Sequence, residues 1–140
     1  MKFTTATALA AALLAGTAAQ AQDATKGEDL FKKRCRSCHS IVAPDGAVIF
    51  KGGRTGPNLF GVIGRQAASD PDYERYKASL AEAGERGLVW DDASFAQYVS
   101  DPTAFLREYL DDAGARSGMT FKLREGADDV YAYLVSVAPE

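Results

Sequence analysis

The segment Cys35-Arg36-Ser37-Cys38-His39 holds both cysteines and the only histidine of the 140-residue chain. All thiol and imidazole chemistry open to the protein is therefore concentrated in about one turn of backbone. The Cys-x-x-Cys-His spacing puts two thiols on one side of a helical turn, with an imidazole next to them. Two vinyl groups of one haem can then be captured as thioethers while His39 Nε2 binds the iron. The sequence thus predicts one covalently attached haem c.

Three other uses of the motif stay open on the residues alone: a redox-active disulfide, a structural disulfide, and part of a zinc site. Zinc would have to take its fourth ligand from a carboxylate, because the chain has no further Cys or His. A thioredoxin-like disulfide needs the motif between a strand and a helix, whereas here the motif closes the first predicted helix. Haem attachment is the favoured interpretation.

The first 21 residues are predicted to be a cleaved secretory signal peptide. Lys2 precedes an apolar run over residues 6–15 that is too short for a permanent membrane span. Ala19-Gln20-Ala21 supplies the small side chains that signal peptidase requires. We expect cleavage after Ala21 and a periplasmic protein, with an uncleaved signal anchor as the alternative.

Composition places the remainder, residues 22–140, in a single globular domain. The chain is 46% hydrophobic and 25% charged, which is ordinary for a folded domain. Its formal net charge of -3 supplies no strongly basic surface, so we expect no nucleic-acid binding.

Hydrophobic periodicity predicts an all-α domain of short helices joined by long loops. A capping box of Thr25 and Glu28 is expected to begin a first helix over about 26–38. Further helices are expected over 76–83 and over about 126–137. Another is expected to be capped by Asp91 or Asp92, and one more to begin at Pro102 after an Asp101 cap. Residues 40–64 and 111–121 are expected to be loops, and no segment alternates like a strand. Because loops this long are unusual in a compact domain, they indicate a chain wrapped around a large apolar cofactor.

Motifs along the whole chain resemble those of the class I c-type cytochromes, most closely the bacterial cytochrome c2 and c550 kind. The similar segments, in the family's order and spacing, are GEDLFKKRCRSCH, TGPNLFGVIGR, GLVW, QYVSDP, GMTF and DDVYAYL. The resemblance implies the class I cytochrome c fold, with short helices and long loops around one covalently bound haem. It excludes the four-helix class of cytochromes, whose attachment motif lies near the C-terminus.

The sixth iron ligand must be a group other than imidazole, because His39 is the only histidine. Met119 is the only methionine left once the signal is removed. On its own a methionine in this setting is more typical of a core residue. The resemblance of GMTF to the family motif implies instead that Met119 is the second axial ligand, which raises the reduction potential. With no open iron position for a substrate, we expect an electron-transfer protein and not an enzyme.

Further roles follow only from the resemblance. It implies that the Pro57 carbonyl accepts the Nδ1–H of the axial histidine, where the bare sequence would indicate a turn. It places Tyr98 near the axial sulfur, although a tyrosine at helical spacing is more often core. Three residues would hydrogen-bond the buried haem propionate: Arg65, Tyr76 and Trp90. Four would join the first and last helices: Gly27, Phe31, Tyr133 and Leu134.

Basic residues gather in the two segments that carry the proposed iron ligands. Residues 26–36 contain five basic and two acidic side chains, and residues 116–125 contain three basic and one acidic, while the rest of the chain is acidic. Such a positive patch would steer the protein onto acidic partners, unless these charges are only solvated helix faces. The resemblance implies a monomeric carrier, with a quinol-oxidising cytochrome bc complex as donor and a photosynthetic reaction centre or a terminal cytochrome oxidase as acceptor.

Overall fold

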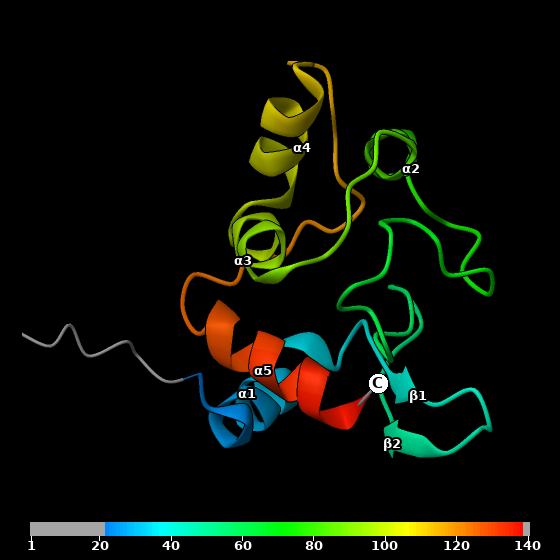
Figure 1. The fold of residues 1–140 in the computed structure, drawn as a ribbon, viewed down its shortest axis with the longest axis vertical. Helices are drawn as coiled ribbons and strands as arrows, with labels where there is room; N and C mark the ends of the chain where they lie inside the picture. The colour runs from blue at the N-terminus through cyan, green and yellow to red at the C-terminus, as the bar shows by residue number, and fades with distance from the viewer. Residues whose placement is uncertain (1–21, 139–140) are drawn as a thin grey trace, which may run out of the picture.

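The fold comes from a computed structural model that describes residues 22–138, so the predicted signal peptide lies outside the described residues. Its elements in chain order are α1 (Ala24–Leu30), the π-helix η1 (Phe31–Cys35), β1 (Ile41–Val42), β2 (Val48–Phe50), α2 (Ala78–Glu85), α3 (Asp92–Ser100), α4 (Pro102–Leu110) and α5 (Ala127–Val137). Figure 1 shows α1 packed on α5 at one end of the molecule and α3 with α4 at the other. Helix α3 also packs on α5, and long loops make up much of the rest of the fold, as predicted. Within residues 22–138, no helix is long and apolar enough to cross a membrane.

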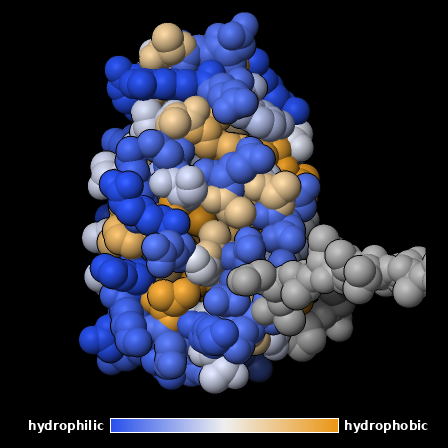
Figure 2. Space-filling model, turned by 90° about the vertical axis from the view of Figure 1, so that its left-hand side faces the viewer, coloured by the Kyte–Doolittle hydropathy of each residue, from blue (hydrophilic) through white to orange (hydrophobic). Residues whose placement is uncertain are grey.

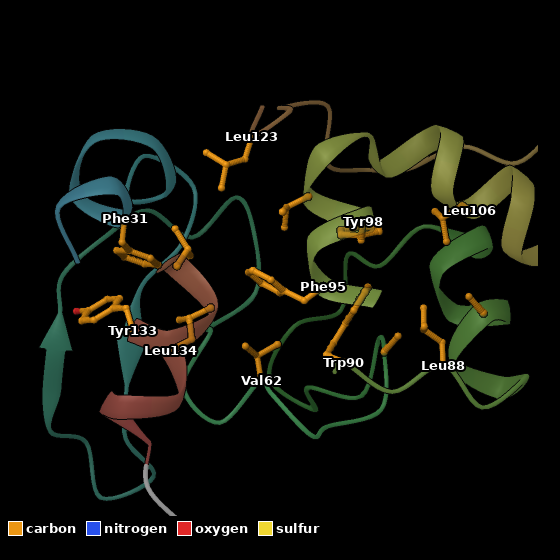
Figure 3. Packing of buried hydrophobic residues seen from close by; sticks show 14 of the residues in the cluster. Phe31, Val62, Leu88, Trp90, Phe95, Tyr98, Leu106, Leu123, Tyr133 and Leu134 are labelled. Carbon is orange, nitrogen blue, oxygen red and sulfur yellow. The ribbon is translucent and has the colours of Figure 1, made fainter. Parts of the chain in front are cut away.

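The contact between α1 and α5 is the most extensive contact between two elements of the described fold, and it depends on Gly27. A Cβ atom on Gly27 would lie 1.9 Å from the Asp129 carbonyl oxygen and 2.8 Å from Tyr133 Cβ. The ring of Phe31, fully buried, packs 5.7 Å from the ring of Tyr133 and 5.1 Å from that of Phe50. The predicted contact between the first and last helices is confirmed (Figure 3).

The first helix begins and ends differently from the prediction. Asp23, and not Thr25, is its N-cap, because the Asp23 carboxylate accepts hydrogen bonds from the backbone N–H groups of Thr25 and Lys26 at 3.0 and 3.2 Å. The Asp23 N–H is in turn held by the Asp129 carboxylate at 2.8 Å. The helix then widens into η1 and stops at Cys35, three residues before the predicted end.

The expectation of no strands is wrong for one short hairpin. Strand β1 pairs antiparallel with β2, with Ile41 opposite Phe50. The turn between them is set by Gly46 at a φ of +87° and by the Asp45 carboxylate, which accepts the Ala47 N–H at 2.9 Å. Strands of two and three residues are too short to reveal an alternating pattern in the sequence.

The later helices agree closely with the sequence. Asp91 caps α3 through a reciprocal capping box with Ser94, and Asp101 caps α4 ahead of Pro102. Helix α5 spans the predicted range, and residues 111–120 form no helix or strand, also as predicted. Helix α2 begins two residues later than expected, at Ala78.

Buried side chains form one continuous cluster from the α1–α5 end to the α3–α4 end. Figure 3 shows Val62, Phe95 and Trp90 between Phe31 and Tyr133 on one side and Leu106 and Leu88 on the other. The surface in Figure 2 is mostly hydrophilic, with hydrophobic residues scattered along its middle. The loops and helices therefore share one core.

The Asp101 carboxylate links α4 to the segment after the long loop, and its protonation should be visible in stability. The Lys122 ammonium, 2.6 Å away, and then the Ala104 N–H hold the Asp101 pKa below the usual 3.8. The lowered pKa contributes stability above pH 3.8, and this contribution is lost as pH falls through the folded pKa.

We expect Asp101→Asn, which keeps the cap but removes the charge, to unfold slightly more easily than the native protein at neutral pH and equally easily in acid. Denaturant titrations at the two pH values measure this, with Asp72→Asn as a control at an exposed carboxylate without a side-chain bond in the described residues. A difference that persists in acid would assign the effect to the cap.

Candidate functional site

A cavity of about 390 Å³ opens between the attachment motif, the long loops and helix α3. All nine residues singled out in the sequence line it: Cys35, Cys38, His39, Pro57, Arg65, Tyr76, Trp90, Tyr98 and Met119. They come from five separate parts of the chain. The fold therefore brings together every predicted site residue.

The attachment loop leaves helix η1 in a tight turn. The Arg36 N–H donates to the Phe31 carbonyl, and the N–H groups of Cys38 and His39 both donate to the Cys35 carbonyl. The two thiols are not joined in a disulfide. Burial, with a smaller effect of Cys38, raises the pKa of the Cys35 thiol to about 11. Redox-active Cys-x-x-Cys sites lower a thiol pKa instead, so this environment disfavours the redox-active disulfide.

The His39 ring is held from two sides. Its Nδ1–H donates to the Pro57 carbonyl oxygen at 2.8 Å, the hydrogen bond that the resemblance implied. A Cβ on Gly56 would lie 2.3 Å from His39 Cε1 and 2.9 Å from Nε2, so only glycine lets the loop lie against the ring. Burial lowers the His39 pKa and the bond to Pro57 partly opposes it. The imidazole is therefore neutral at neutral pH with its Nε2 lone pair available, which is the form that binds metals.

Residues 51–56, which we call the glycine strap, pack against the attachment loop, residues 36–39. The sequence by itself does not predict them as site residues. A Cβ on Gly52 would lie 1.7 Å from the His39 carbonyl oxygen, and one on Gly53 would lie 2.1 Å from that of Ser37. The Gly53 N–H donates to the Arg36 carbonyl and the Gly56 N–H to the Cys38 carbonyl, both at 2.8 Å. The cluster of glycines in this loop is the signal that could have indicated such close packing, although by itself it predicts only turns.

Met119 is positioned by a hydrogen-bonded group of side chains. Its backbone N–H donates to Ser117 Oγ at 3.1 Å, and the Tyr98 hydroxyl lies 2.9 Å from the same oxygen. The Ser117 N–H donates to Thr103 Oγ1 on helix α4 at 3.2 Å. Burial raises the pKa of the Tyr98 phenol, so it stays protonated. Ser117 and Thr103 are thus further site residues that the sequence analysis did not assign.

Arg65 and Trp90 are brought together by paired backbone. The Trp90 N–H donates to the Arg65 carbonyl at 3.1 Å, and the Trp90 carbonyl accepts the Gly64 N–H at 2.7 Å. The Arg65 guanidinium donates to the Phe60 and Asn58 carbonyls, so it is anchored in the loop and is not a freely solvated charge. Burial raises the pKa of Tyr76, which lines the same part of the wall.

Three exposed basic side chains at the cavity mouth were not singled out in the sequence. Arg34, Arg75 and Lys77 are exposed, line the cavity and take part in no ion pair among the described residues. Arg75 also donates to the Arg54 carbonyl and lies over the Tyr73 ring. The aliphatic part of the Lys77 side chain packs against Gly118, where a Cβ would lie 3.0 Å from Lys77 Cγ.

These features fit haem c. Two unpaired thiols and a neutral imidazole lie at one wall, and the remaining lining includes Val62, Leu80, Phe95 and Leu134. Among residues 22–138, no group of three or more His, Cys, Asp or Glu side chains could hold a metal ion, so the zinc alternative finds no set of ligands there. A cavity with this lining beside a Cys-x-x-Cys-His loop is typical of the c-type cytochromes, and it places the chain in that class.

Comparisons with known proteins give the family. Cytochrome c2 of Rhodobacter capsulatus is 51% identical over 137 residues, which is 98% of each chain. Cytochrome c-551 of Roseobacter denitrificans is 57% identical over 116 residues, covering 83% of this chain and 81% of its own. No protein-family model matches the chain.

Solved structures agree with these relatives. The structure of cytochrome c2 from Rhodobacter capsulatus has a TM-score of 0.78 at 54% identity, covering 82% of this chain and 97% of that one. Cytochrome c2 from Paracoccus denitrificans has a TM-score of 0.79 at 45% identity, covering 84% and 97%. The chain belongs to the cytochrome c2 family of class I c-type cytochromes, electron-transfer proteins that carry one covalent haem c and are not enzymes.

Proposed function

We propose that the protein is a soluble, periplasmic one-electron carrier whose haem iron is bound axially by His39 and Met119. The observation that carries the proposal is that both side chains line one cavity together with the two free thiols of Cys35 and Cys38. When attached, haem c supplies the one-electron Fe²⁺/Fe³⁺ couple. A thioether on the second axial position raises the potential and leaves no iron position for a substrate.

The chain's own residues would keep both ligands fixed while the charge on the iron changes. The Pro57 carbonyl holds the His39 ring at one orientation, with Gly56 against its face. Ser117 holds the Met119 backbone and is itself tied to Thr103 on α4. We propose that Arg65, Tyr76 and Trp90 bind the buried propionate, as in the family. Ligands anchored in this way favour electron transfer with little change of geometry.

We also propose that residues 1–21 are a signal peptide cleaved after Ala21, which leaves residues 22–140 as the cytochrome domain. The expected intact mass of the protein isolated from its own host is that of a chain beginning at Gln22 plus one haem that survives acid-acetone extraction. A mass that includes residues 1–21 would contradict the cleavage. Loss of the haem on extraction would contradict the covalent attachment.

The partners we propose are a quinol-oxidising cytochrome bc complex as donor and a photosynthetic reaction centre or a cytochrome oxidase as acceptor, with the protein acting as a monomer. The exposed charges of Arg34, Arg75 and Lys77 at the cavity mouth support docking on acidic surfaces. Opposite charges around an electron-transfer site raise the encounter rate more than the final affinity.

This docking predicts a rate that falls as salt rises. Screening shortens the range of the field to about 10 Å at 0.1 M ionic strength, so the bimolecular rate with membranes containing the donor complex should fall while the transfer step within the complex changes little. Arg34 is the cleanest residue to reverse, because it lines the cavity, is exposed and is in no ion pair of the described structure, whereas Lys32 is paired with Glu28.

Stopped-flow measurements should show that Arg34→Glu lowers both the association rate and its salt dependence. The matched control is Asp128→Lys, a reversal on the exposed first turn of α5, which should leave the rate unchanged or raise it slightly. A rate that stays flat or rises with salt would mean that the basic mouth does not guide docking.

A further inference from the structure

The Pro57 carbonyl that accepts the His39 Nδ1–H is not fixed in place by Pro57 itself. Proline has no backbone N–H, so it offers no donor that could hold it to a neighbouring segment. Its position is therefore determined by the residues on either side. Gly56 donates its N–H to the Cys38 carbonyl at 2.8 Å, which fixes the chain ahead of Pro57. The residue that follows Pro57 is Asn58, the only asparagine of the chain.

The Asn58 side chain pairs with the backbone of strand β1 in the way that a neighbouring strand would. Its Oδ1 accepts the Val42 N–H at 3.0 Å, and its Nδ2 donates to the Val42 carbonyl at 2.8 Å. The same Oδ1 also accepts the Phe60 N–H at 3.1 Å. One side chain thus joins residues 57–60 to the hairpin, across 16 positions of sequence.

The segment 57–60 directs its carbonyl groups at two residues of the site. The Pro57 carbonyl accepts the His39 Nδ1–H at 2.8 Å. The Asn58 and Phe60 carbonyls accept from the Arg65 guanidinium at 3.3 and 3.2 Å. Of these bonds, the one from Pro57 reaches a proposed iron ligand. A shift of this segment away from the hairpin would therefore lengthen the bond that orients the His39 ring.

We propose that Asn58 is a positioning residue that holds the Pro57 carbonyl on His39 Nδ1–H and thereby tunes the reduction potential of the haem. The proposal rests on His39 as an axial ligand, and it depends neither on Met119 nor on the proposed partners. A hydrogen bond from Nδ1–H to a carbonyl makes the imidazole a stronger donor to the metal. A stronger donor favours ferric over ferrous iron, so a looser bond should raise the potential.

An asparagine suits this position because the Val42 backbone presents both a donor and an acceptor. A carboxamide supplies both kinds of partner from one planar group. An aspartate would accept the two N–H groups but would place an oxygen against the Val42 carbonyl. A serine is shorter and can bond only the nearby Phe60 N–H. Substitution can therefore separate the local bond from the bonds to the hairpin.

The experiment compares Asn58→Ala with the native ferrous holoprotein by NMR and redox titration. The His39 Nδ1 proton should exchange with solvent about tenfold faster in the variant, because the bonds that hold its acceptor are lost. The ratio of reduced to oxidised protein at a fixed ambient potential should rise severalfold, where tenfold corresponds to about 59 mV for a one-electron couple. Asn58→Ser, which keeps the local bond, should behave like Asn58→Ala.

Gln66→Ala is the matched control. Gln66 is also a carboxamide in the cavity wall, and its Nε2 donates to the Gly84 carbonyl at 2.9 Å across 18 positions of sequence. That bond joins no part of the segment 57–60, so the control should keep the native exchange rate of the His39 Nδ1 proton. A general loss of stability would also speed exchange of the Leu123 N–H, which donates to the Val99 carbonyl. The proposal expects the Leu123 N–H to exchange at the native rate in the Asn58 variants.

A measurement on the native protein tests the proposal even where neither Asn58 variant takes up haem. The Val42 N–H, the Phe60 N–H and the His39 Nδ1–H should become accessible to solvent in one opening, with the same dependence on denaturant. A His39 Nδ1 proton that stays protected when the Val42 N–H exchanges would overturn the proposal.

Two further results would overturn it. One is a native exchange rate and potential in folded Asn58→Ala. The other is a native exchange rate in folded Asn58→Ser, which would assign the effect to the local bond with Phe60. The His39 ring protons of the native ferrous protein separate this proposal from the proposed function. Without the large upfield shifts of a haem-bound imidazole, both fail. With those shifts and an unchanged exchange rate in the variants, the role of Asn58 fails alone.

Discussion

Met119→Ala is expected to keep its haem and to lower the reduction potential by on the order of 0.1 V, within the ~0.8 V range that axial ligands span. Removing the thioether takes away the ligand that favours the reduced iron, and water or an added ligand can fill the position. Redox titration measures the potential. Carbon monoxide added to the reduced protein, or imidazole to the oxidised protein, measures access to the iron.

Leu80→Ala is the matched control for this variant. Leu80 also lines the cavity, and it carries no atom able to bind iron. Its replacement should shift the potential much less and leave the native protein's resistance to added ligands in place. If Met119→Ala and Leu80→Ala behave alike, the sixth ligand is not Met119.

Gly27→Ala is expected to destabilise the protein by about 3 kcal/mol, the upper range for overpacking a well-packed contact. The new methyl would overlap the Asp129 carbonyl oxygen, 1.9 Å from it, and α1 and α5 would have to move apart. Alanine favours a helix over glycine by about 1 kcal/mol, which is too little to offset that separation. Guanidinium chloride unfolding of the holoprotein measures the difference.

The control for Gly27 is Gly114→Ala in the loop before Met119. There the nearest atom to the new Cβ is Asp112 Oδ1 at 3.1 Å, the end of an exposed side chain that can move aside. A change within about 0.5 kcal/mol is expected. Equal stability of Gly27→Ala and the native protein would mean that α1 can shift without cost.

Helix boundaries were predictable where one side chain decides them. Asp91 and Asp101 each cap a helix through their own carboxylates, and Pro102 follows the second cap, so nearby residues determine where α3 and α4 begin. The start of α1 was not predictable in this way. Two local caps compete there, Asp23 and the pair Thr25 and Glu28, and the structure uses Asp23, whose backbone N–H is also held by the Asp129 carboxylate from the other end of the chain.

The site was predictable to a similar degree. The Cys-x-x-Cys-His motif predicted Cys35, Cys38 and His39 by itself, while the resemblance supplied Met119 and five further residues, and all nine line the cavity. The sequence did not predict the glycine strap or Ser117 as site residues. The strap acts through close contacts between backbone atoms, and Ser117 acts through a hydrogen bond from the Met119 backbone N–H. Such contacts depend on how distant segments fold together, which single residue types do not reveal.

The glycine strap also ties the conformation of residues 36–39 to that of residues 51–56. The strap lies directly on the backbone of the attachment loop, hydrogen-bonded to Arg36 and Cys38. A side chain at Gly52 or Gly53 would therefore displace the backbone that carries Cys38 and His39, so these two positions accept only glycine without a shift of the loop.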